Sequence, residues 1–204
     1  GSKAFMLCTG IKGITVPSGV KAINGSVFQD CSSLKKVVLN GDVTSIGSKA
    51  FMNCALLADF VFPDTVSSIN SEAFSGCKSL NSAIPMKVTT IGNKAFLGCA
   101  ALDVALPTSA TTIGTYVFQD CVSLGKTAKI ILPAELTKVS DGMFKGCTSL
   151  PWVLIHDNIK SIGKESFSGC SATGFNKMSI PSSVTSVGSN AFNGCTSLAT
   201  VSFA

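Results

Sequence analysis

Nine cysteines are the residues of this chain best suited to chemistry, and each follows a phenylalanine at the same distance. A reactive cysteine needs surroundings that favour its thiolate, but the chain has only one histidine, His156, and no carboxylate pair stands out among its 11 acids. A catalytic centre requires a nucleophile, a base and an oxyanion site together. We therefore predict that the chain is not an enzyme. The repeated pairs are Phe5/Cys8, Phe28/Cys31, Phe51/Cys54, Phe74/Cys77, Phe96/Cys99, Phe118/Cys121, Phe144/Cys147, Phe167/Cys170 and Phe192/Cys195.

Metal binding and disulfide formation are the other roles open to these cysteines. A zinc site collects its ligands at short spacing, whereas successive cysteines here are at least 22 residues apart. We therefore predict no metal and no cofactor, with adventitious binding of a soft metal as the remaining alternative. Equivalent residues of stacked repeats lie about 4.7–5 Å apart as parallel side chains, not as facing pairs. This arrangement predicts nine free cysteines that act as small buried side chains.

Composition narrows the possible partners. The net charge of +5 comes from 16 lysines and no arginine, and arginine supplies the bidentate contacts that readers of nucleic acid favour, so we predict no nucleic acid partner. The chain is 46% hydrophobic but has no apolar run of 18 residues, which predicts no membrane span in this segment. The string that opens the chain, Gly1–Phe5, occurs again at Gly47–Phe51. We expect a piece of a longer protein whose ends are covered by further rungs, a cap or self-association.

The spacing of Phe-x-x-Cys defines the elements that must position these residues. Its steps of 22 to 26 residues predict a solenoid of about nine rungs, with the first and last incomplete, forming one domain over residues 1–204. A branched aliphatic residue stands five positions before most phenylalanines, as Ile46 does before Phe51, and glycine often follows it, which predicts a sharp bend at Gly47 and its equivalents. A short apolar segment, often closed by proline, predicts one strand in each rung: 14–17, 37–40, 60–63, 83–85, 104–107, 130–133, 153–156, 178–181 and 201–203.

Two strings together resemble a known family. Leu34-x-x-Val37-x-Leu39 matches the strand half of a leucine-rich repeat, and it is followed by the string from Val43 through Gly47 and Phe51 to Cys54. The combination resembles the BspA-like, or Treponema-type, leucine-rich repeat family over essentially all 204 residues. The resemblance implies a right-handed coil with a parallel sheet on its concave face and short strands or turns on the other side. It also implies a cell-surface or secreted protein, since several members are adhesins.

Candidate binding residues come from the alternation of side chains along each strand, which turns the middle residue outward. That row is apolar from Val38 through Val61 and Ile131 to Leu154, and a second row two residues earlier is charged or aromatic. An apolar strip edged by charges is typical of a partner-binding surface; the alternatives are that β-branched residues simply favour strands, and that Trp152 covers an inserted arc. The candidate site comprises Val38, Asp59, Val61, Lys129, Ile131, Trp152, Leu154 and Lys177.

Two functions remain open from the sequence. The first is a non-catalytic interaction or adhesion module that binds a protein or glycan, such as a host matrix or cell-surface molecule, through the concave sheet. The second is a structural spacer about 40 Å long, from nine rungs at 4.7–5 Å each. Two further residues have weaker claims: Tyr116 is expected to be exposed beside the turn, and Asn24 begins an Asn-Gly-Ser sequence that fits a glycosylation acceptor.

Overall fold

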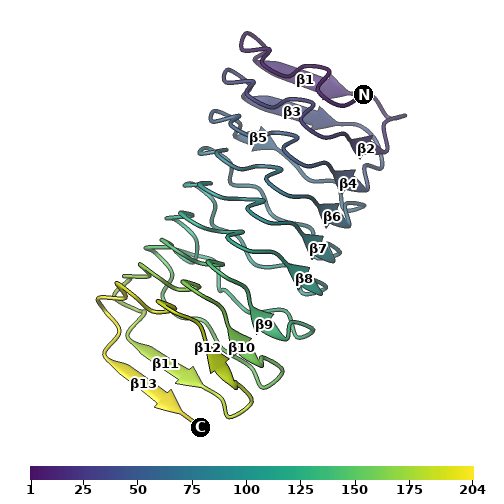
Figure 1. The fold of residues 1–204 in the computed structure, drawn as a ribbon. Coiled ribbons are helices and arrows are strands. Elements are labelled where there is room, and N and C mark those ends of the chain that lie inside the picture. Colours follow the sequence, from purple (N-terminus) through teal and green to yellow (C-terminus); the bar gives the residue numbers. More distant parts are fainter.

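The computed structural model describes residues 1–204 as a coil of about eight turns without a helix. The rungs stack from the N-terminus at one end to the C-terminus at the other (Figure 1). Each rung contributes to one continuous core of 55 buried hydrophobic residues. The predicted solenoid with parallel strands is thus confirmed.

The predicted strand segments form a first set of parallel strands, called here the strand face. At the N-terminal end the order is β1–β3–β5, with Thr15 opposite Val38, and at the C-terminal end β11 pairs with β13. Between these two sheets a single bridge joins Ile131 to Leu154. The strands are β1 (Gly13–Val16), β3 (Lys36–Leu39), β5 (Asp59–Phe60), β11 (Lys177–Ile180) and β13 (Thr200–Phe203).

The strand face is interrupted in the middle, so the prediction of a strand in every rung is wrong there. Residues 83–85 and 104–107 form no ladder. These two rungs are one residue shorter than the first ones, and they carry alanine at positions 83 and 105, which favours strands less than valine or isoleucine does. In this region the backbone N–H of Asp103 donates to the side chain of Asn81 at 3.0 Å, whereas that of Asp59 donates to a main-chain carbonyl, Lys35 O.

A second sheet consists of two-residue strands, one in each complete rung (Figure 1). Their order is β2–β4–β6–β7–β8, followed by a separate group, β9–β10–β12. The break between β8 and β9 coincides with a three-residue insertion near residues 125–128, which lengthens the chain between these two strands. There the Ser140 hydroxyl donates to Ile113 O at 2.6 Å. The strands are β2 (Ala22–Ile23), β4 (Ser45–Ile46), β6 (Ser68–Ile69), β7 (Thr90–Ile91), β8 (Thr112–Ile113), β9 (Lys138–Val139), β10 (Ser161–Ile162) and β12 (Ser186–Val187).

Glycine follows five of these eight strands, and its role there differs from the predicted one. A Cβ on Gly47 would lie 2.6 Å from Gly25 N, and one on Gly92 would lie 2.4 Å from Ser71 N. Glycine stands at these positions because the preceding rung approaches too closely for a side chain. Left-handed backbone occurs instead two residues before and two residues after each phenylalanine, as at Lys49 (φ 59°) and Asn53 (φ 61°).

Alternation of the backbone around each phenylalanine builds what we call the Phe–Cys corner, the segment from two residues before Phe to the Cys. There the N–H groups of Lys49, Phe51 and Asn53 donate to three carbonyls of the next rung at 2.7–3.0 Å. The phenylalanine rings stack along the coil with centroids 5.2–6.0 Å apart. Each internal ring is thereby covered on both sides, and Phe51 to Phe167 are fully buried in this column.

The cysteines of the corner donate hydrogen bonds, a role that the sequence did not indicate. Cys54 Sγ lies 3.1 Å from Phe28 O, and the same contact recurs at 3.0–3.2 Å from Cys31 to Cys195. All nine cysteines are free and eight are buried, which confirms the predicted column of thiols. The position suits cysteine because its side chain is small and apolar yet carries a weak donor.

Candidate functional site

The strand face carries a row of exposed apolar side chains, called here the apolar strip: Val38, Val61, Ala83, Ala105, Ile131 and Leu154. The exposed fractions of Val61, Ile131 and Leu154 are 73%, 58% and 55%, whereas Val38 is half-buried. Their neighbours in the chain point inward, since Phe60 and Ile130 are each 3% exposed. The alternation predicted from the sequence therefore holds, even in rungs without a ladder.

Shallow hollows follow the strip along the coil. One of about 550 Å³ is lined by Val61, Phe62, Ala83 and Met86, among others. Another of about 320 Å³ lies near the C-terminal end, between the rungs of Leu154 and Ser179. A third, of about 300 Å³, opens at the N-terminal end of the coil beside Phe5, where no rung covers it. The first two lie on the strip, whereas the third does not.

The second predicted row does not present all its charges equally. Lys36 and Asp59 form an ion pair at 2.7 Å, so they neutralise each other. Lys129 and Lys177 are exposed and have no carboxylate within 4 Å. The structure therefore brings the predicted residues into one face but leaves unpaired positive charge only near its C-terminal end.

Asp103 belongs to the same row and holds the three-residue insertion in place. Its carboxylate accepts hydrogen bonds from the N–H groups of Gly125, Thr127 and Ala128 at 2.7–3.2 Å, and from the Thr127 hydroxyl at 2.6 Å. Partial burial alone would raise the pKa of Asp103, but these four bonds outweigh it and lower that pKa. The carboxylate is thus occupied within the chain.

Trp152 stands between Lys129 and Lys177 in this row and is 47% exposed. Beside it, the glycines of the two inserted arcs, near residues 125–128 and 172–175, pack against Pro151, since Cβ atoms on Gly125 and Gly174 would lie 2.9 and 2.8 Å from that ring. Trp152 lines the 320 Å³ hollow together with Leu154 and Lys177. The indole therefore remains available on the strand face.

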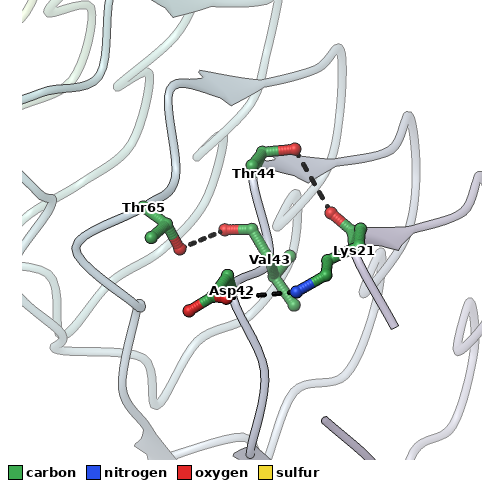
Figure 2. A network of polar contacts seen from close by, with 5 residues as sticks. All are labelled: Lys21, Asp42, Val43, Thr44 and Thr65. Atoms are coloured by element: carbon green, nitrogen blue, oxygen red, sulfur yellow. Dashed lines mark hydrogen bonds and ion pairs between the residues drawn. The ribbon is translucent and has the colours of Figure 1, made fainter. Parts of the chain in front are cut away.

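On the second sheet, unlike near the C-terminal end of the strand face, polar side chains form hydrogen bonds and ion pairs within the chain. Figure 2 shows the Lys21 ammonium 3.1 Å from Asp42, the Thr44 hydroxyl donating to Lys21 O at 3.2 Å, and the Thr65 hydroxyl donating to Val43 O at 2.8 Å. The contact of Thr44 recurs in three further rungs at 3.3 Å and in one at 3.1 Å, in each case between a hydroxyl and a carbonyl of the preceding rung. These four donors are Ser67, Thr89, Thr111 and Thr185.

The cysteines and His156, which were considered for catalysis, take part in contacts that hold the coil together. Burial raises the pKa of Cys54 to about 12 and holds the pKa of Cys77 and Cys99 well above the ordinary value, so these thiols stay protonated donors. The carbonyl of His156 accepts from Ile159 N, as the strand-ending prolines do in other rungs, and its Nε2 lies 3.1 Å from Pro133 O. No group of three His, Cys, Asp or Glu side chains is placed to hold a metal ion.

Two weaker candidates are placed as follows. Tyr116 was expected to be exposed, but it is half-buried, because its ring lies over Gly142 in the next rung, where a Cβ would come within 2.0 Å of it. Its backbone occupies a left-handed position of the Phe–Cys corner (φ 56°). Asn24 is exposed at the end of β2, at the turn position that glycine occupies in other rungs.

Sequence comparison now adds to this geometry. The model of the BspA-type leucine-rich repeat region matches residues 1–125 and 123–204, in six copies. The chain belongs to the BspA-type leucine-rich repeat family. A comparison with curated proteins finds no match. No membrane-spanning helix occurs in this BspA-type coil.

Solved structures of similar proteins support the same assignment. A leucine-rich cell surface protein from Faecalibacterium prausnitzii is 30% identical with a TM-score of 0.67; the match covers 100% of this chain and 62% of that protein. A leucine-rich repeat protein from T. pallidum is 30% identical with a TM-score of 0.65, over 92% of this chain and 78% of the other. A leucine-rich repeat protein from Bacteroides ovatus is 22% identical with a TM-score of 0.61, and the match covers 94% of this chain and 69% of that protein. At this identity the match shows the shared fold alone.

Proposed function

We infer that this BspA-type coil is a non-catalytic recognition module that binds a protein partner through the apolar strip of the strand face. The observation that supports it is the exposure of Val61, Ile131 and Leu154 on one face, beside hollows large enough for side chains of a partner. Contiguous exposed apolar surface edged by charge is the composition of interaction sites.

The location proposed for the protein is the cell surface or the exterior of the cell. The support is the Faecalibacterium prausnitzii relative, which is described as a cell surface protein. A module at that location meets host matrix and cell-surface molecules, which we propose as the source of the partner. A glycan partner is less favoured than a protein, because the strip offers aliphatic side chains in place of the polar groups that bind sugar hydroxyls.

The test is a pair of substitutions on the strip, Ile131→Ser and Leu154→Ser, in the 204-residue chain. Binding to immobilised matrix proteins and to cultured host cells is measured, with circular dichroism to show that the coil persists. We expect binding to weaken by about tenfold or more, as for central residues of an interface. Leu56→Ser with Val122→Ser is the matched control, because those side chains are similarly apolar and exposed (45% and 40%) but follow the cysteines, away from the strip.

The outcome also decides the competing function. If the strip variants bind as well as the unmodified chain, recognition by this face is refuted and the coil acts as a spacer. Equal losses in the strip and control variants would mean nonspecific hydrophobic adsorption and would refute the proposal as well.

A further inference from the structure

Lys129, Trp152 and Lys177 occupy the same position in three consecutive rungs. The bridge between Ile131 and Leu154 sets Lys129 and Trp152 side by side, two residues before each bridge partner, and Lys177 is the first residue of β11 in the next rung. All three are exposed on the strand face. We name these three residues the Lys–Trp–Lys row.

The positive charge of this row is not neutralised within the chain. Lys36, at the equivalent position near the N-terminal end, has Asp59 at 2.7 Å. Elsewhere, Lys145 and Lys164 both pair with Glu165. Neither Lys129 nor Lys177 has a carboxylate within 4 Å, and the nearby carboxylate of Asp103 is bound to the inserted arc. Unpaired charge beside an apolar surface favours a ligand of opposite charge.

The row also borders a hollow that accepts an apolar side chain. Its volume is about 320 Å³, and its lining combines Trp152 and Leu154 with Asn176, Lys177 and Ser179. Tryptophan is one of the residue types enriched among interface hot spots, and Trp152 is exposed beside this hollow. An apolar group seated here would contact Trp152 and Lys177, with Lys129 in the rung on the other side of Trp152.

We propose that the Lys–Trp–Lys row binds an extended acidic segment of a protein partner, with an apolar side chain in the hollow and one carboxylate at each lysine. The two lysines are two rungs apart, with the rung of Trp152 between them, which is a distance of about 10 Å at the usual strand spacing. Every second side chain of an extended chain faces the same surface, about 6.6 Å from the last, so the apolar residue has an acidic residue two positions before it and another two positions after it. The two carboxylates then lie about 13 Å apart, and the flexible lysine side chains cover the difference from about 10 Å. This inference rests on the proposed function, because it assigns the partner chemistry at one end of the same face.

The experiment selects a phage-displayed library of random 12-residue peptides on the immobilised 204-residue chain. The enriched peptides are then synthesised with a fluorescent label, together with counterparts in which Gln and Asn replace Glu and Asp, and affinities are measured by fluorescence polarisation. We expect enriched peptides to carry two acidic residues four positions apart with an apolar residue midway between them, and their affinity to fall steeply with added salt.

Three variants test the assigned contacts. Lys129→Gln and Lys177→Gln are each expected to weaken the acidic peptides by about threefold to fivefold, as exposed ion pairs do, and Trp152→Ala by about tenfold or more. Lys138→Gln is the matched control: it removes the same charge from an exposed lysine that lies in β9 of the second sheet. Its effect on affinity is expected to stay below twofold.

The outcomes separate this inference from the proposed function. Neutral or basic peptides that lose affinity in Ile131→Ser and Leu154→Ser would overturn the acidic ligand while leaving recognition by the strip intact. Binding of sialylated or sulfated glycans on an array, without binding of the acidic peptides, would overturn it in favour of an anionic glycan. Peptide binding that neither the strip nor the lysine variants change would refute both proposals.

Discussion

The Phe–Cys corner and the strand face belong to the same rungs but follow different rules. At the corner every rung after the first repeats the stacked ring and the buried thiol, and the internal rungs repeat the backbone bonds to the next rung. On the strand face the ladder of backbone hydrogen bonds is interrupted between β5 and the bridge at Ile131. Its exposed side chains differ in size from one rung to the next, from the methyl group of Ala83 to the indole of Trp152. The corner holds the rungs together. The exposed side chains of the strand face differ between rungs, so this face can provide specificity for a partner.

The largest expected effect comes from breaking the corner in a central rung. Phe96→Ala removes a fully buried ring that stacks on Phe74 and Phe118 at 5.5 and 5.7 Å. We expect the free energy of unfolding to fall by about 3–5 kcal/mol, as for other buried phenylalanines. Urea unfolding followed by circular dichroism measures the change, and Leu56→Ala serves as an exposed control. An unchanged urea midpoint for Phe96→Ala would contradict the role of the corner.

A smaller effect is expected when the donor at the corner is changed. In Cys99→Ala the hydrogen bond to Phe74 O (3.1 Å) is lost together with the volume of the sulfur atom, and we expect a loss of about 1–2 kcal/mol. Cys99→Ser keeps a donor and is expected to lose less. Thermal unfolding of the two variants is compared. If serine is the more damaging of the two, apolar packing and not the hydrogen bond explains the cysteine.

On the strand face, the hydrogen bonds of Asp103 that hold the inserted arc should contribute less to the free energy of unfolding. Asp103→Asn keeps one acceptor but removes the charge from the four hydrogen bonds to residues 125–128. Because the carboxylate is partly exposed, we expect a loss of only about 1 kcal/mol at pH 7, measured by urea unfolding.

The pH dependence of the same contact follows from its pKa. The pKa of Asp103 is lower in the folded chain than in the unfolded one, so its contribution is complete above the ordinary carboxyl pKa of about 4 and disappears as the pH falls through the lower folded value. The stability difference between wild type and Asp103→Asn should therefore shrink between pH 5 and pH 2, values chosen to bracket about 4. A difference that stays constant over this range would show that the charge of Asp103 does not hold the arc.

The smallest effect concerns the interrupted ladder. Ala83→Val with Ala105→Val places better strand formers in the two short rungs, at positions that are exposed. We expect a gain of no more than about 0.5 kcal/mol, with slower amide hydrogen exchange at Ile84 and Val104. Unchanged exchange would mean that the shorter rung length, and not the side chains, interrupts the sheet.

Particular residues show how far the sequence reading reached. The burial of Phe51, Cys54 and Ile46 and the exposure of Ile131 and Leu154 were predicted correctly, because burial follows from periodic spacing within one rung. The left-handed backbone at Lys49 and the contact that excludes a Cβ at Gly47 were not. Both depend on how closely the adjacent rung approaches, which the residues of one rung do not encode.

The sequence by itself determined the stack: the repeat that forms each rung, the column of phenylalanines and thiols, and the side of each strand that faces water. The reason is that these features repeat in every rung, and a single rung cannot bury its apolar residues alone. Only the tertiary structure decided which charges remain free, since Lys36 meets Asp59 while Lys129 and Lys177 meet no carboxylate. Pairing depends on distances between side chains of neighbouring rungs, and insertions and deletions shift those distances from one rung to the next.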